Sequence, residues 1–162
     1  MYNAQKKSSV IALCSAALLG SAIAVAQDEP DAGANAISAR QGFMQVVSWE
    51  AGPLFGMAKG EVAYDAGVAS ANAANLKAIS QYDIGRLFVA GTSKADRPGK
   101  TRALDDIWAD LGKFGQAAEN WRAAVAVVAE EAGKGQAELT AAVGALGKAC
   151  GECHKPFRAD EF

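Results

Sequence analysis

Two cysteines and the only histidine of this 162-residue chain stand together at Cys150, Cys153 and His154. Residues at i, i+3 and i+4 of a helix lie on one face, so a helix here would direct two thiols and an imidazole the same way. Cys-x-x-Cys-His is the attachment signature of haem c, whose two vinyl groups the thiols would meet. The sequence therefore predicts one covalently attached haem c per chain, with His154 as the proximal ligand of the iron.

Other uses of paired cysteines fit less well. A disulfide between Cys150 and Cys153 would close so short a loop that it would stabilise little. Structural zinc sites take four Cys or His ligands, and only three such residues follow Ala26. A thioredoxin-like redox pair is expected near a β-α-β pattern, which this sequence lacks. A bundle without haem, carrying the motif by accident, is the remaining alternative.

The elements that must position the motif are predicted to be helices. Apolar or small residues recur at helical steps over Ile37–Ala58, and Asp65 is a suitable N-cap for a second helix that ends near Tyr82. The second helix is expected to bury Val68, Asn72, Leu76 and Ile79.

The second half of the chain predicts two more helices after a long connection. Turn residues gather over 83–101, a third helix is expected over 103–132, and a fourth runs from Gln136 toward Arg158. No segment alternates apolar and polar residues as a strand would. Four helices with one long connection predict an all-α, antiparallel four-helix bundle. The third helix should turn inward Leu104, Ile107, Trp108, Leu111, Phe114, Ala118, Trp121, Val125 and Val128.

Residues 1–26 have the features of a secretory signal: two lysines, an apolar run over Val10–Ala24 and small residues before a cleavage site after Ala26. The mature domain is then expected at 27–162, in the periplasm and without Cys14. The apolar run is shorter than the roughly 20 residues of a membrane span, so no membrane association is expected. Loss of two lysines changes the net charge from -2 to -4, which disfavours a nucleic-acid partner.

The motif lies in the last predicted helix, whereas the commonest c-type cytochromes carry it near the mature N-terminus and place a methionine ligand after it. In this respect the chain resembles the class II cytochromes, and specifically cytochrome c-prime. The resemblance spans the mature chain and is carried by Arg40-Gln41-Gly42-Phe43-Met44, Gly52-Pro53-Leu54, Trp108 and the run from Cys150 to Arg158.

This resemblance implies a left-handed antiparallel four-helix bundle, a homodimer, and a five-coordinate haem that binds nitric oxide or carbon monoxide. Low-spin relatives carry electrons instead. The family's distal position falls on Met44, whose thioether would be either a sixth iron ligand or an apolar filler of the distal pocket. Arg40 would pair with a haem propionate, unless it is an ordinary surface arginine. Arg158 would lie beside the proximal face, unless it is a solvated charge displaced by Pro156.

Three functions remain open: a gas-binding protein, a low-spin electron carrier with Met44 as ligand, and a haem enzyme. The enzyme is the weakest, because peroxide cleavage needs a distal acid and base and the chain has no second histidine. We therefore expect no enzymatic activity. An apolar distal pocket would admit neutral diatomic gases, which favours gas binding. The sequence does not identify the redox partner protein.

Overall fold

The computed structural model describes residues 31–162, and the predicted leader with Cys14 and its cleavage site lies outside them. Its only strand-like contact in that range is an isolated antiparallel bridge between Ala103 and Arg158. No helix there is long and apolar enough to cross a membrane. The elements, in chain order, are α1 (Ala32–Lys59), α2 (Ala66–Ser80), the 3₁₀ helix η1 (Ile84–Leu87), α3 (Asp106–Ala109), α4 (Leu111–Glu131) and α5 (Gln136–Phe157).

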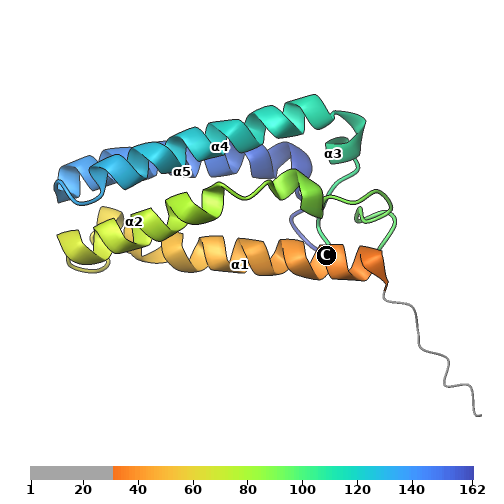
Figure 1. The fold of residues 1–162 in the computed structure, drawn as a ribbon, viewed down its shortest axis with the longest axis horizontal. Coiled ribbons are helices and arrows are strands. Elements are labelled where there is room, and N and C mark those ends of the chain that lie inside the picture. Colours follow the sequence, from red (N-terminus) through yellow and green to blue (C-terminus); the bar gives the residue numbers. More distant parts are fainter. Residues whose placement is uncertain (1–30) are drawn as a thin grey trace, which may run out of the picture.

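The four long helices form a closed ring in which each successive helix reverses direction (Figure 1). Helix α1 packs against α2 and α5, and α4 packs against the same two partners. The connection from α2 to α4, including η1 and α3, covers the end of the bundle where α1 begins and α5 ends (Figure 1). The predicted all-helical, antiparallel four-helix bundle is confirmed.

Aspartates begin three of the long helices. The side chains of Asp31, Asp65 and Asp110 each accept a hydrogen bond from the backbone N–H three residues ahead, which satisfies a donor that has no partner within the helix. Gly60 ends α1 in the left-handed conformation, with φ of 74°, which glycine adopts at no steric cost.

The third predicted helix is broken, so the expectation of one continuous helix over 103–132 was wrong. The backbone of Asp110 has φ of -143° and ψ of 79°, which separates the short α3 from α4. Because its side chain binds the backbone locally, Asp110 starts a new helix there. Leu111, expected to face the core, is 62% exposed.

The predicted inner face of α2 was right at Leu76, which is fully buried, and wrong at Val68, which is exposed; Asn72 and Ile79 are half-buried. Ala69 and Ala73 are fully buried beside Leu76. Alanines permit close approach of the neighbouring helices. Packing therefore selected the small residues for the interior.

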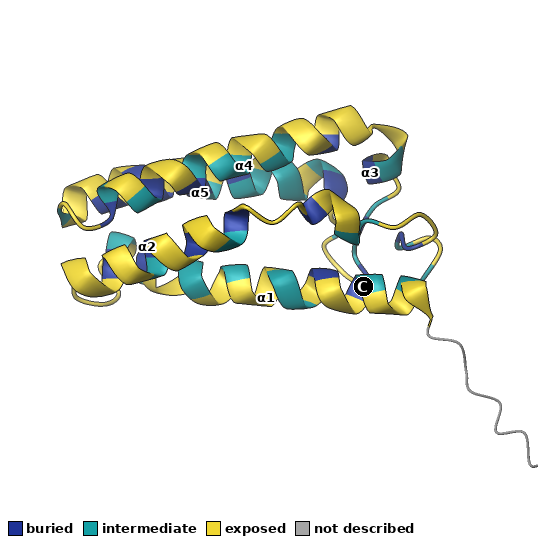
Figure 2. Ribbon diagram, in the orientation of Figure 1, coloured by how far each residue is buried: buried dark blue, intermediate teal, exposed yellow. Residues whose placement is uncertain are grey.

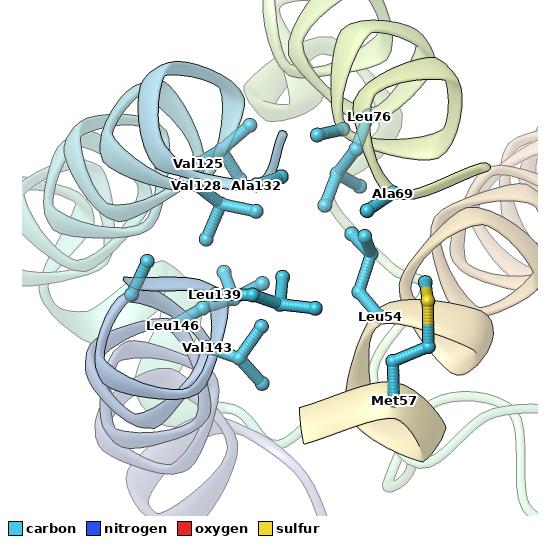
Figure 3. Close-up of a cluster of buried hydrophobic side chains, with 12 residues drawn as sticks. Leu54, Met57, Ala69, Leu76, Val125, Val128, Ala132, Leu139, Val143 and Leu146 are labelled. Atoms are coloured by element: carbon cyan, nitrogen blue, oxygen red, sulfur yellow. The ribbon is translucent and has the colours of Figure 1, made fainter. Parts of the chain in front are cut away.

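The main core lies between the four helices, and its side chains point toward one another from all of them (Figure 3). Exposed residues lie along the outer face of each long helix (Figure 2). A second buried cluster, at the end covered by the connection, contains Ala103, Ile107, Phe114 and Phe157. Both clusters border the candidate site.

Candidate functional site

The final turns of α5 carry the Cys-x-x-Cys-His motif into the bundle. Cys150, Cys153 and His154 are each half-buried, and all three line one cavity. No disulfide joins Cys150 and Cys153. Pro156 cannot donate a backbone hydrogen bond, and the helix ends one residue later at Phe157. The motif thus lies on one face of a helix that stops just beyond it.

The cavity has a volume of about 700 Å³ and a mostly apolar wall built by α1, the connection, α4 and α5. This volume is within the range of about 300–1,000 Å³ common for cofactor sites. The cavity brings together every site residue predicted from the sequence: Arg40, Met44, Cys150, Cys153, His154 and Arg158.

Aromatic rings form the wall on the side of the connection. The ring centroids of Phe88 and Phe114 are 4.6 Å apart, and those of Phe114 and Phe157 are 5.4 Å apart. Trp108 packs on Phe88 and donates its indole N–H to the Phe88 carbonyl oxygen at 3.1 Å. These edge-to-face contacts make a stable apolar surface against which a flat group can pack.

The donor set fits haem c better than a bare metal ion. No three Cys, His, Asp or Glu side chains in the described part of the chain are placed to hold a metal ion. Gly52 contributes bare backbone to the wall, and a Cβ added there would meet nothing within 4 Å. Two thiols and one imidazole facing a large apolar cavity are the groups that a covalently attached porphyrin requires.

The protonation states in the cavity agree with this use. Burial raises the pKa of the Cys150 thiol, and burial together with the neighbouring Cys150 raises that of Cys153. Reactive redox cysteines show the opposite shift. Burial, and then the positive charges of Arg158 and Arg102, lower the pKa of His154. The imidazole is therefore neutral near pH 7 and can donate a nitrogen lone pair to a metal.

Arg40 is buried at one edge of the cavity, with 5% of its surface exposed. Its two terminal nitrogens donate to the Leu87 carbonyl, to the hydroxyl and carbonyl of Thr92, and to the Thr101 hydroxyl, over 3.0–3.3 Å. Its guanidinium carbon lies 4.7 Å from the Phe88 ring centroid. Arg40 thus anchors the connection to α1. Its predicted contact with a propionate stays a prediction.

Met44 and Arg158 also line the cavity, but both are partly open to solvent. Met44 is 37% exposed and belongs to neither buried cluster, unlike Met57, which is 1% exposed. The backbone of Arg158, directly after α5, is extended and forms the antiparallel bridge with Ala103. Their roles as distal and proximal residues stay predictions.

Several site residues were not predicted from the sequence. Thr92 and Thr101 bind Arg40 from the connection, where no periodicity marks them. Phe88, Arg102 and Phe162 line the cavity as well. The only sequence signal was the length of this connection, because long connections in compact domains are usually functional.

Comparisons with known proteins agree with this geometry. The cytochrome c' family model matches residues 35–158. A cytochrome c' of Cereibacter sphaeroides is 43% identical over 122 residues, covering 75% of this chain and 81% of the relative. A solved cytochrome c' of Rhodobacter is 41% identical with a TM-score of 0.77, covering 80% of this chain and 98% of the other. A nitric oxide complex of a cytochrome c prime variant from Alcaligenes xylosoxidans is 26% identical with a TM-score of 0.67, covering 79% and 97%.

Proposed function

Since this chain belongs to the cytochrome c' family, whose members bind haem c, we propose that it carries one haem c and binds nitric oxide and carbon monoxide at the iron. The observation that carries the proposal is the placement of Cys150, Cys153 and His154 on one face of α5 at the wall of a 700 Å³ apolar cavity. The haem would supply an iron atom that binds diatomic gases and changes between two oxidation states.

The protein's own residues hold and enclose this group. Cys150 and Cys153 would form the two thioether links, and neutral His154 would bind the iron. The rings of Phe88 and Phe114 provide a rigid apolar wall. Along this apolar part of the wall, water and anions would lose hydration without gaining partners, while neutral diatomics lose little. The nitric oxide complex of the Alcaligenes relative supports the same ligand class here.

We propose a five-coordinate iron in which Met44 is an apolar part of the cavity wall and not a ligand. Methionine commonly fills irregular gaps beside apolar groups. The nitric oxide complex of the cytochrome c prime variant from Alcaligenes xylosoxidans supports an iron that is open to a small ligand. The alternative is a six-coordinate, low-spin electron carrier with Met44 as ligand, and it is supported by the presence of Met44 in the cavity wall.

The remaining parts of the proposal concern location and partners. We propose export to the periplasm with cleavage after Ala26, assembly as a homodimer, and electron exchange with a redox protein. No catalytic activity, nucleic-acid partner or membrane association is proposed. The excess of acidic residues supports the absence of a nucleic-acid partner.

The optical spectrum of the dithionite-reduced protein, with and without carbon monoxide, tests the proposal. Protein matured with a working haem-attachment system should show a broad high-spin spectrum that changes sharply with the gas. Sharp low-spin bands unaffected by carbon monoxide would support the electron carrier instead. Protein without haem absorption would overturn the haem assignment.

Single cysteine variants test how the haem is attached. In Cys150→Ala or Cys153→Ala, one thioether link is lost, and the mass of the denatured protein should reveal impaired attachment. Lys148→Ala, which changes an exposed residue on the same helix, is the matched control and should retain the full haem mass. A variant lacking one cysteine that still holds haem through two thioether bonds would contradict the assignment.

A further inference from the structure

The segment after α5 returns to the cavity. The Ala159 N–H donates to the Arg102 carbonyl oxygen at 2.8 Å, and the Lys94 side-chain amine donates to the Glu161 carbonyl oxygen at 2.6 Å. Together with the bridge between residues 103 and 158, these bonds hold the segment 158–161 against the connection. Figure 1 accordingly shows the C mark near the end of the bundle covered by that connection.

This segment places the ring of Phe162 at the opening of the cavity. Phe162 lines the cavity although it is 60% exposed, so its ring lies between the interior and solvent. The Arg102 guanidinium carbon lies 5.3 Å from the centroid of that ring, within cation–π range. Arg102 also donates to the Asp160 carbonyl oxygen at 3.0 Å and lines the cavity itself. One arginine therefore holds both the backbone and the ring of the segment.

We propose that Phe162, held by Arg102, limits the access of water and small solutes to the haem edge. This rests on the proposed function, because it requires haem in the cavity. An apolar cover around a metal site controls solvent access and local dielectric, and hence the reduction potential. Water admitted at the edge favours the more positively charged ferric state. The ring of Phe162 therefore raises the potential and slows electron exchange with small reagents.

The test compares wild-type holoprotein with Phe162→Ala and Arg102→Lys. The lysine variant keeps the positive charge but lacks the planar guanidinium that stacks on the ring and binds the Asp160 carbonyl. Trp49→Ala is the control, because Trp49 is 78% exposed but does not line the cavity. Two quantities are measured: the midpoint potential, and the stopped-flow rate of reduction by dithionite.

Phe162→Ala should lower the potential and yet increase the reduction rate several-fold. A lower potential alone would slow reduction, so acceleration reports an exposed haem edge. Arg102→Lys should shift both quantities in the same directions by less, and Trp49→Ala should shift neither. Wild-type values in Phe162→Ala, with the haem covalently bound, would overturn this inference but leave the proposed function intact. Wild-type protein without haem would overturn both.

Discussion

Arg97 and Asp31 join the connection to the first turn of the bundle through two charged hydrogen bonds, at 2.7 and 3.2 Å. The side-chain hydrogen bond from Arg97 is the main reason why the pKa of Asp31 falls from 3.8 to about 2. Asp31 also caps α1. A single exposed pair therefore links helix initiation to the position of the connection.

The pH dependence of stability follows from this shift. Because the folded pKa is below the unfolded value, the pair stabilises the protein above pH 3.8, and this contribution is lost as the pH falls toward 2. Asp31→Asn keeps a good N-cap and loses the charge. We expect a small decrease in thermal midpoint at pH 7 that disappears near pH 2, measured by circular dichroism.

A double-mutant cycle with Arg97→Gln provides the control. If the two residues act together, the double variant should lose no more stability at pH 7 than either single variant. Fully additive losses would mean that Asp31 and Arg97 act independently.

Removal of the Arg40 guanidinium should lower the free energy of unfolding by far more than the substitution of Asp31 or Arg97. Arg40→Met keeps the apolar stem but leaves buried carbonyl and hydroxyl acceptors in the connection without a donor. Each unsatisfied buried polar group costs about 1–3 kcal/mol, and we expect a loss of about 2–4 kcal/mol in the free energy of unfolding. Urea denaturation followed by circular dichroism measures it. Arg86→Gln, at an exposed position of η1, is the control and should change the value by about 0.5 kcal/mol or less.

Two leucines show where the observed core differs from the core that periodicity predicts. Leu139 is fully buried in the main core, whereas Leu111 is 62% exposed. Leu139→Ala should cost about 2–5 kcal/mol because it removes apolar burial and leaves a cavity. Leu111→Ala should change stability by about 0.5 kcal/mol or less, as surface substitutions do. Similar losses at both positions in urea denaturation would show that Leu111 is packed in solution.

Replacement of Met44 distinguishes the two states of the iron. Met44→Ala should leave the spectrum of the reduced, five-coordinate protein nearly unchanged, because the thioether is not a ligand. In a six-coordinate protein the same change would convert the spectrum to high spin. Met57→Leu, a volume-conserving change of a methionine in the main core, is the control and should keep the wild-type spectrum. Conversion in Met44→Ala alone would identify the electron carrier.

The helical fold and the haem motif could be predicted from the sequence because both depend on short-range spacing. Cys150, Cys153 and His154 satisfy the motif within five consecutive positions, and helical steps of apolar residues do not require knowledge of the partner helix. The start of α2 was also marked, since the residue type of Asp65 predicts an N-cap.

The buried face of α2, the partners of Arg40 and the break at Asp110 depended on contacts that short-range patterns do not encode. In α2, alanines and a valine have similar apolar character, so only packing against the other helices selected Ala69 and Ala73 for burial. The partners of Arg40 lie 47 to 61 residues away in a connection without periodicity. Residue type alone does not decide whether Asp110 continues one helix or caps the next, so the break there was not predicted.

Arg40 binds both Thr92 and Thr101, so the residues between them form a loop closed at its base. A backbone bond from Lys94 to the Ala103 carbonyl, 2.7 Å long, closes the same base. The exposed tip at Pro98 and Gly99 is therefore separated from the cavity wall. Loop closure entropy rises slowly with length, so insertions at the tip cost little. Residues added at the tip therefore change the outer surface without moving the ring of Phe88.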